Sequence, residues 1–444
     1  MKRAPQHLLF NILAIGVAAM ALTSHAAPSR ERGLGQGRAP RIMHEYSLPS
    51  FSLVNFGYSQ AEVDAAQANG LAITDLPGIG SGLEHLKGNH YLSVTDRGPN
   101  GDRADGFKFF PLPQFTPTIV LFELRHDRIE PEAVLPIVND LGEGVTGIPN
   151  AANADTTPFL TATSPVPLPF NPDGMDVEDV HTLKHGGFIL VEEYTPSVVI
   201  VGDDGHVLRR YTPAGKTLPG AHYTVSDTLP GVFGQRRNNR AFEVIAVSDD
   251  GNTAYTMTQS PMGSTSAGSV YRDSSLVRII RMDIRDPLNL QVTGMFLFKM
   301  LAPTNFPAGN AARDLKISGA DTVSRDKLLI LQGTDKLGAG GHKVVLVDLT
   351  GATDVLTLPD ASAVPLVYEN VLTDFAALGI TLAETEIVAD LINDLPEITE
   401  RKLEGLTILN RNEIVISSDN DFGLGDVLGE LTKVYTIRLG APLR

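Results

Sequence analysis

Cysteine and tryptophan are both missing from this chain of 444 residues. The absence of cysteine excludes disulfides, thiolate metal sites and lipid attachment to a cysteine. The absence of tryptophan disfavours a carbohydrate-binding surface, because indole rings are well suited to stacking on sugars. The folded chain must therefore be stabilised by a large hydrophobic core rather than by cross-links.

Long apolar runs are also scarce, and the one present lies at the N-terminus. Lys2 and Arg3 precede an apolar stretch from Leu8 to Leu22, and Ser24-His25-Ala26 follows as a small-x-small cleavage site. This arrangement is typical of a secretory signal peptide over residues 1–26. The apolar stretch is shorter than the ~20 residues that a membrane helix needs. We expect an exported protein, periplasmic or secreted, without a membrane span.

Positive charge is in deficit as well. The chain has 36 Lys and Arg against 52 Asp and Glu, so its formal net charge at pH 7 is −16. An acidic surface repels polyanions, which argues against nucleic acid and anionic membranes as partners. An anionic substrate would need cations gathered at its site. We expect a monomer that acts on a small molecule.

What the sequence does contain is a repeated pattern. A glutamate stands beside a short apolar run, and a polar or acidic residue ends the next apolar run 12 to 16 positions later. The pattern starts at Glu84, Glu178, Glu243 and Glu404, which are separated by 94, 65 and 161 residues. The widest gap leaves room for a degenerate copy at Lys316-Ile317-Ser318. Such repeats indicate radially repeated β-sheets, in which equivalent positions converge on a central site.

Short runs of β-forming residues, separated by turns, extend over most of the chain. We therefore predict an all-β fold, a single β-propeller domain over residues 45–444, with six blades favoured and seven as the alternative. Residues 27–44 are rich in Arg, Gly and Pro and are expected to form a flexible lead-in. Residues 369–400 carry helical periodicity and are expected to form a small helical insertion.

Acidic residues at the ends of the repeated runs are candidate cation ligands. They are Glu84, Asp96, Glu178, Glu192, Glu243, Glu404, Asp419 and Asp421. Calcium prefers about six to eight oxygen ligands, so carboxylates that converge from several blades would suit it. The same residues allow a structural alternative, in which each carboxylate accepts hydrogen bonds from strand-end N–H groups and holds the blades together.

Basic residues stand beside these acids. Arg97, Arg240, Lys316 and Lys402 could together bind an oxyanion, because arginine offers a bidentate fork and lysine a point charge. The alternative is that they neutralise the adjacent carboxylates. The chain has no P-loop, no Gly-x-Ser-x-Gly nucleophile elbow and no His-Glu-x-x-His motif, so nucleotide-binding, serine-hydrolase and zinc-protease chemistry are unsupported.

Five runs of residues carry a resemblance to a known family. They are Thr95-Asp96-Arg97-Gly98-Pro99, Glu192-Glu193-Tyr194-x-Pro196, Asn239-Arg240-Ala241-Phe242-Glu243, Lys316-Ile317-Ser318, and Lys402-x-Glu404-Gly405 followed by Ser418-Asp419-Asn420-Asp421. These runs resemble the motifs of the phytase-like family, also described as having esterase-like activity of phytase, and they occur in the family's order. The resemblance extends from Tyr46 to Arg444 and implies a β-propeller.

The chain departs from the family pattern at two places. Gln332-Gly333 stands where members often carry Glu-Arg, and Val244 rather than glycine follows Glu243. If the missing acid and arginine contribute to the site, activity could be altered or lost.

Together with the acidic repeats, the resemblance implies metal-assisted hydrolysis of an ester, with a phosphomonoester favoured over a carboxylic ester and calcium as the metal. The predicted roles are catalysis by Glu404, Asp419 and Glu243, substrate binding by Arg97, Arg240, Lys316 and Lys402, and metal binding by Glu84, Asp96, Glu178, Glu192 and Asp421. Two alternatives stay open, a non-catalytic calcium-stabilised binding propeller and a propeller lactonase.

Overall fold

The computed structural model describes residues 39–424 and 429–444. The predicted signal peptide and most of the predicted lead-in lie outside the described residues. Within them strands dominate, and α1 (Gln60–Ala68) is the one α-helix. It begins at a capping box, in which Ser59 and Glu62 satisfy each other's backbone N–H groups. The all-β prediction is confirmed, and no helix in the described part of the chain is long and apolar enough to cross a membrane.

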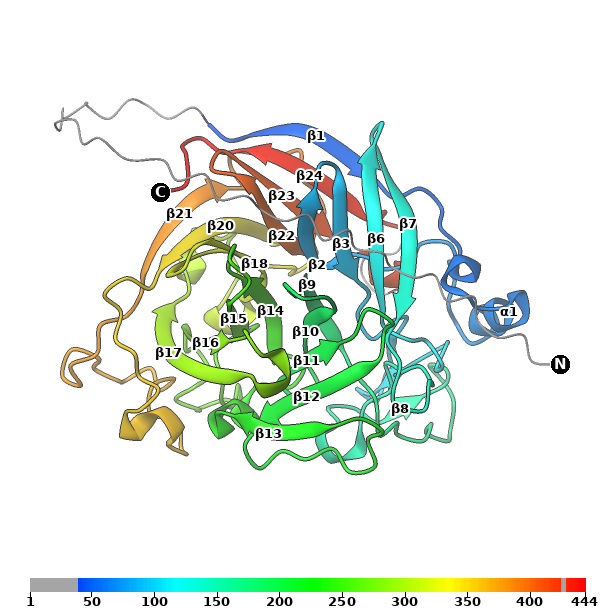
Figure 1. The fold of residues 1–444 in the computed structure, drawn as a ribbon, viewed down its shortest axis with the longest axis horizontal. Helices are drawn as coiled ribbons and strands as arrows, with labels where there is room; N and C mark the ends of the chain where they lie inside the picture. The colour runs from blue at the N-terminus through cyan, green and yellow to red at the C-terminus, as the bar shows by residue number, and fades with distance from the viewer. Residues whose placement is uncertain (1–38, 425–428) are drawn as a thin grey trace.

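Most strands belong to five radial units of four strands each, called blades below (Figure 1). The first blade consists of β2 (Ser81–Lys87), β3 (His90–Val94), β6 (Thr118–Arg125) and β7 (Arg128–Pro136). The second consists of β9 (Val177–Thr182), β10 (Phe188–Glu192), β11 (Ser197–Val201) and β12 (Val207–Pro213), with β13 (Val225–Leu229) added at its outer edge. The third consists of β14 (Phe242–Val247), β15 (Thr253–Thr258), β16 (Leu276–Asp283) and β17 (Gln291–Lys299).

The fourth and fifth blades complete the set. The fourth consists of β18 (Lys316–Ser324), β19 (Lys327–Thr334), β20 (Gly341–Asp348) and β21 (Glu384–Asp390). The fifth consists of β22 (Leu403–Asn410), β23 (Glu413–Ser418), β24 (Lys433–Arg438) and β1 (Arg41–Ser47). A small separate sheet is made of β4 (Gly101–Asp102), β5 (Lys108–Phe109) and β8 (Pro158–Phe159). Short 3-10 turns connect several of these elements, among them η3 (Gly231–Gln235), η6 (Ala312–Asp314) and η8 (Asp421–Gly423).

The inner strands β2, β9, β14, β18 and β22 form a closed ring, in which each packs against the next and β22 packs against β2 (Figure 1). A side-chain hydrogen bond joins every adjacent pair. These bonds run from Thr182 N to Glu84 (2.8 Å), Ile245 N to Asp179 (2.8 Å), Thr322 Oγ1 to Val247 O (2.8 Å), Ile408 N to Asp321 (2.7 Å) and His85 N to Thr407 Oγ1 (3.2 Å). The arrangement is that of a β-propeller.

The blade count is lower than expected. The described residues form five blades rather than six or seven, and the inner strands correspond one for one to the five copies of the sequence repeat. The length of the chain suggested more blades than are present, because long connections between strands take up the remaining residues. The largest are residues 137–176 and 349–383, which lie between β7 and β9 and between β20 and β21.

The first described strand closes the ring. β1 pairs antiparallel with β24, with Arg41 opposite Arg438 and Ser47 opposite Lys433, so the blue and red strands lie side by side in Figure 1. Ser47 also pairs with Arg128 of β7, which joins the fifth and first blades at their outer edges. Residues 41–44, expected to belong to a flexible lead-in, are therefore part of a sheet.

The helical insertion predicted over residues 369–400 is wrong. These residues form turns and β21, which pairs with β20 and places Ile387 opposite Val345. The apolar residues that suggested a helix do not share a buried face, since Val371 and Leu378 are exposed in the turn region. Apolar spacing alone does not distinguish a helix from irregular chain when no partner surface is known.

The hydrophobic core lies between neighbouring blades rather than in one central mass. One cluster, for example, joins Ile189 and Val191 of the second blade to Ile245 and Val247 of the third, and similar clusters fill the other four interfaces. Each inner sheet is thus buried on both faces, as every residue of β10 and β11 is. The packing fixes the strand ends that surround the centre of the ring.

Candidate functional site

Antiparallel pairing brings the start of each inner strand next to the end of the second strand of its blade, at one end of the ring. In the fourth blade Lys316, the first residue of β18, pairs with Gly333, and in the fifth Leu403 pairs with Ser418. The other blades pair the start of the inner strand with the end of the second strand in the same way. One or two residues after the five second strands stand Asp96, Glu193, Gln259, Asp335 and Asp419. These polar residues gather with the acids and lysines that begin the inner strands.

A cavity of about 380 Å³ lies at this end of the ring. We call it the mouth cavity. It is lined by Asp96, Arg97, Asn100, Gly101, Asp102, Lys108, Glu178, Glu193, Asn239, Arg240, Gln259, Lys316, Asp335, Arg401, Lys402, Glu404, Asp421 and Leu424. Eight of the twelve site residues predicted from the sequence are among them. Buried Asp419 and Glu243 stand next to them, because Lys402 pairs with Asp419 and Gln259 bonds Glu243.

Lys402 binds three carboxylates of the mouth cavity at once. Its Nζ lies 3.2 Å from Glu404, 3.2 Å from Asp419 and 2.5 Å from Asp421. Burial alone would lower the pKa of Lys402, but the charges of Asp421, Glu404 and Asp419 together raise it well above its usual value. The ammonium group therefore stays charged and acts as an internal cation within the acidic cluster.

The turn that carries Asp421 is held in a rare backbone conformation. Asp421 and Phe422 have φ values of 47° and 55°, which L-residues seldom adopt. Buried Phe422 packs edge-on against Phe115, with ring centroids 4.9 Å apart, and Asn420 caps the turn by accepting the N–H of Phe422. These contacts offset the backbone strain and hold the Asp421 carboxylate toward the cavity.

Lys316 stands on the other side of Glu404. Its Nζ lies 2.6 Å from Asp335 and 3.5 Å from Glu404. The fourth blade has Gln332-Gly333 where family members often carry Glu-Arg, and Asp335 supplies a carboxylate in that same blade. Gln332 itself is buried and bonds the backbone of Leu301, and a Cβ at Gly333 would lie 2.1 Å from the His342 ring. An arginine at position 333 would therefore require that ring to move.

Arg97 is anchored by one carboxylate and one amide side chain. Its Nη1 lies 2.7 Å from Asp176 and 2.6 Å from the side-chain oxygen of Asn239, and its backbone N–H also bonds Asp176. Its Nε is buried and donates no hydrogen bond within the described residues. Arg240 is less constrained, with one hydrogen bond to the carbonyl of Leu315 and no ion pair in the described part of the chain. Both guanidinium groups retain capacity to bind an anion.

Two groups of three carboxylates are compact enough to hold a metal ion. Asp96, Asp419 and Asp421 form one, and Asp176, Glu178 and Glu193 form the other, each with one oxygen per residue within 4.8 Å of the rest. Glu193 Oε1 and Glu243 Oε2 are buried and accept no hydrogen bond within the described residues. An all-oxygen donor set with unpaired buried oxygens fits a hard divalent cation.

The acids of the mouth cavity outnumber its bases, and their pKa values reflect this. Burial, reinforced by neighbouring carboxylates, raises the pKa of Asp96, Glu178 and Glu193 well above their usual range. Burial raises the pKa of Glu243 to about 8 and that of Asp419 to about 7, although Lys316 and Lys402 oppose the shifts. In the absence of a metal ion the cluster must therefore hold protons near neutral pH.

Two of the predicted metal ligands lie outside this cavity. Glu84 sits farther along β2, where it pairs with His181 at 2.9 Å and accepts both donors of Thr182. Glu192 is fully buried, pairs with Arg210 and accepts the backbone N–H groups of Tyr194 and Thr195. Both carboxylates join structural elements, which is the structural alternative that the sequence left open.

Several functional candidates were not selected from the sequence. Glu193, Asp335, Gln259, Asn239 and Arg401 belong to the lining, and Asp176 groups with Glu178 and Glu193. The repeated strand pattern could have identified Glu193, Gln259 and Asp335, because each is the residue directly after the second strand of its blade. Glu192, the last residue of β10, was selected instead of Glu193 because the sequence does not show that its side chain pairs with buried Arg210 of β12.

Comparison with known proteins gives a family. Residues 74–422 match the model of the family described as "Phytase-like: Esterase-like activity of phytase". A search of curated proteins returned no match. The chain belongs to the phytase-like family, and the resemblance seen in the sequence is confirmed.

Solved structures resemble this one only distantly. The PQQ-bound aldose sugar dehydrogenase from Streptomyces coelicolor is 10% identical with a TM-score of 0.36, over 90% of this chain and 98% of that one. A virginiamycin B lyase from Staphylococcus aureus is 12% identical with a TM-score of 0.30, over 82% and 95%. A luciferin-regenerating enzyme is 10% identical with a TM-score of 0.33, over 81% and 77%. All three TM-scores lie below 0.5.

Proposed function

We propose that the protein is an exported, metal-assisted ester hydrolase that favours phosphomonoesters over carboxylic esters. The observation that carries this proposal is that one cavity combines buried carboxylates having unpaired oxygens with guanidinium and ammonium groups. Carboxylates suit a divalent cation, and a cation together with basic side chains suits a phosphate. Membership of the phytase-like family supports an ester as the substrate.

Asp176, Glu178 and Glu193 are the residues that we propose hold the metal, with calcium as the favoured ion. Among the described residues this group forms one ion pair, between Asp176 and Arg97 at 2.7 Å, and Glu178 and Glu193 form none, whereas Lys402 contacts both Asp419 and Asp421 of the other group. A calcium ion bound there would polarise the phosphoryl oxygen and lower the pKa of a water molecule.

The basic residues are proposed to bind the anionic part of the substrate. Arg97 is fixed by Asp176 and Asn239, so its guanidinium group keeps a defined orientation. Arg240 and Lys316 supply further positive charge from the third and fourth blades. Glu404 lies between the ammonium groups of Lys316 and Lys402 and holds both in place. Pre-positioned donors of this kind stabilise charge that develops on the phosphoryl oxygens.

Two carboxyl groups have pKa values suited to proton transfer near neutral pH. Glu243, with its pKa raised to about 8, is mostly protonated at pH 7 and could give its proton to the departing alkoxide. Asp419, with its pKa raised to about 7, is partly ionised and could accept a proton from the attacking water. We propose these roles for the two residues.

One alternative has a specific observation in its favour. The ion pairs of Lys402 neutralise much of one carboxylate group, as expected if the mouth cavity were a structural feature of a non-catalytic binding propeller. The two proposals differ in turnover. A lactone hydrolase would be detected in the same assays.

The test is a panel of phosphomonoesters, carboxylic esters and lactones, assayed with calcium and with a chelator. We expect phosphomonoester hydrolysis that chelation abolishes and calcium restores. Faster hydrolysis of a lactone or carboxylic ester would assign the site to that class instead. If no compound is hydrolysed in either condition, the hydrolase proposal is wrong and the binding propeller replaces it.

A further inference from the structure

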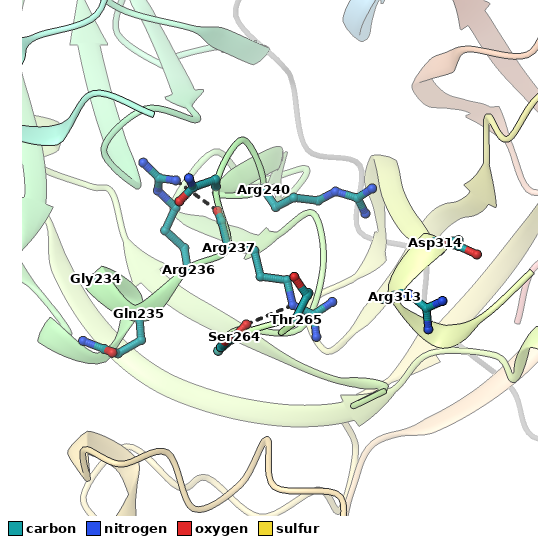
Figure 2. Close-up of a pocket in the computed structure, with 11 residues that line it drawn as sticks. Gly234, Gln235, Arg236, Arg237, Arg240, Ser264, Thr265, Arg313 and Asp314 are labelled. Atoms are coloured by element: carbon teal, nitrogen blue, oxygen red, sulfur yellow. Dashed lines mark hydrogen bonds between the residues drawn. The ribbon is translucent and has the colours of Figure 1, made fainter. Parts of the chain in front are cut away.

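A second and larger cavity lies beside the mouth cavity. Its volume is about 640 Å³, and it is lined by Gly234, Gln235, Arg236, Arg237, Asn238, Arg240, Gly263, Ser264, Thr265, Arg313 and Asp314 (Figure 2). Arg240 also lines the mouth cavity, so the two cavities share this side chain. We call the second one the arginine cavity.

The charge of the arginine cavity is opposite to that of the mouth cavity. Four arginines line it and one carboxylate, Asp314. That carboxylate is already engaged, because it lies 3.0 Å from Lys336 Nζ and accepts the backbone N–H of Ala311. Little negative charge of the protein is therefore left to balance the arginines.

Two of these arginines have no carboxylate partner. Arg236 pairs with Asp155 at 2.6 Å and Arg313 with Asp273 at 3.2 Å, but Arg237 and Arg240 form no ion pair within the described residues. In Figure 2 Arg240 extends in the direction of Arg313 and Asp314, while Arg236 turns away from them. Positive charge thus gathers on the wall between the two cavities.

Arg237 is the most informative residue of the group. It is only 8% exposed, and its Nε and Nη2 donate to the carbonyls of Gly263 and Tyr271. Its Nη1 is buried and has no hydrogen-bond partner in the described part of the chain. Burial and the nearby charge of Arg240 lower its pKa to about 10, although Asp273 opposes the shift. A buried guanidinium with an unused N–H group and no direct ion pair within the described residues is costly unless an anion completes it.

We propose that the arginine cavity is an oxyanion-binding site, which takes a phosphate, sulfate or similar tetrahedral group on Arg237 and Arg240. The side-chain hydroxyl of Thr265 lies on the same wall and offers a further donor, whereas the Ser264 hydroxyl already donates to Ser266. A tetrahedral oxyanion suits this set because guanidinium N–H groups and hydroxyls can each bond a different oxygen. The proposal does not require that the mouth cavity hydrolyse esters.

Inorganic sulfate is the probe, titrated calorimetrically into the full mature chain at constant ionic strength, with chloride as the screening control. We expect one binding event for sulfate and none for chloride. Arg237→Gln and Arg240→Gln should each weaken it about tenfold or more, because each removes a charge-assisted hydrogen bond. Arg285→Gln, an exposed arginine paired with Asp283, should bind as the wild type does.

Two results would overturn the proposal. In the first, the wild type binds neither sulfate nor phosphate. In the second, a folded Arg237→Gln variant binds with full affinity. If Arg237→Gln does not fold, Arg240→Gln and the more exposed Arg313→Gln replace it, and unchanged affinity in both also refutes the site. Glu404→Gln should leave sulfate affinity unchanged, which separates this site from the mouth cavity.

The source of the oxyanion can be read from turnover. Sulfate that raises KM at constant kcat would show that the site receives an anionic group of the substrate. Sulfate that changes kcat alone would show that it receives a separate free anion. Either result supports the site only if the effect is lost in Arg237→Gln, because Arg237 lines the arginine cavity and not the mouth cavity, whose basic residues are also proposed to bind an anion. The calorimetric result stands even if no ester is hydrolysed.

Discussion

The ammonium nitrogen of Lys402 lies 3.2 Å from Oδ2 of Asp419, and the backbone N–H of Asp419 bonds the carbonyl of Lys402 at 3.0 Å. The two residues are joined twice because they flank the paired ends of β22 and β23. The ion pair places a fixed positive charge inside a group of carboxylates. Any metal ion that approaches this group must compete with the lysine, so calcium is expected to favour the carboxylates around Glu178.

Calcium binding is expected to strengthen as the pH rises. Burial and neighbouring carboxylates raise the pKa values of the proposed ligands Glu178 and Glu193 well above their usual range, so a cation must displace the protons that these groups hold in its absence. Metal binding should therefore release protons. Calorimetry in buffers of different ionisation enthalpy measures this release directly. Calcium affinity that does not change with pH would contradict the prediction.

Without metal, Asp419 should make the fold less stable as the pH rises. Its folded pKa of about 7 lies above the unfolded value, so between about pH 4 and 7 the unfolded chain loses a proton that the folded chain keeps. The contribution of Asp419 to the free energy of unfolding is therefore most favourable below about pH 4 and is lost as the pH rises to about 7. We expect Asp419→Asn to gain stability relative to the wild type as the pH rises from 4 to about 8. Urea unfolding of both proteins at each pH measures the difference in their free energies of unfolding. A difference that does not change with pH would contradict the prediction.

Neighbouring glutamates should behave in opposite ways when each is changed to glutamine. Glu192→Gln leaves the buried charge of Arg210 without its partner and should reduce the free energy of unfolding by roughly 3–5 kcal/mol. Glu193→Gln removes a carboxylate whose pKa is raised by burial and whose Oε1 is unpaired, so stability should hold or increase.

Calcium affinity distinguishes the same pair of variants. It should fall in Glu193→Gln and stay unchanged in the folded fraction of Glu192→Gln. Thermal melts with and without calcium measure both quantities, because a ligand of the folded state raises the melting temperature by mass action. Equal calcium shifts in the two variants would remove Glu193 from the proposed metal site.

Glu404→Gln is expected to reduce ester turnover by about a hundredfold or more, while the β-sheet circular dichroism spectrum is retained. The substitution keeps the shape of the side chain but removes the charge that holds Lys316 and Lys402 in position. Asp250→Asn, in an exposed turn, is the matched control and should be fully active. Normal turnover in a folded Glu404→Gln variant would assign Glu404 a structural role only.

Glu84 should control the ionisation of His181. Burial lowers the pKa of His181, but Glu84 and other acids raise it to about 9. Because this folded value exceeds the unfolded one, the pair stabilises the fold fully below about pH 6.5, and the effect is lost as the pH rises through about 9. In Glu84→Gln the His181 pKa, followed by NMR, should fall toward or below 6.5. A pKa that stays near 9 would show that Asp321 and Asp179 suffice.

The sequence by itself determined the class of fold and identified many residues of the candidate site. Five copies of a strand pattern predicted a propeller, because equivalent strand ends in radial sheets must meet near the axis. The same pattern selected Asp96, Glu178, Lys316 and Glu404, all of which line the mouth cavity. These features depend on local alternation and repetition, which a single sequence displays directly.

Only the tertiary structure decided which acids share the site and how the ring is closed. Glu193 lines the cavity while Glu192 pairs with buried Arg210, and Glu84 lies farther along β2, where it pairs with His181. The pairing of β1 with β24 and the association of Arg236 to Arg240 with residues near Arg313 bring distant segments together. Such contacts depend on the closure of the whole ring, so no local sequence signal specifies them.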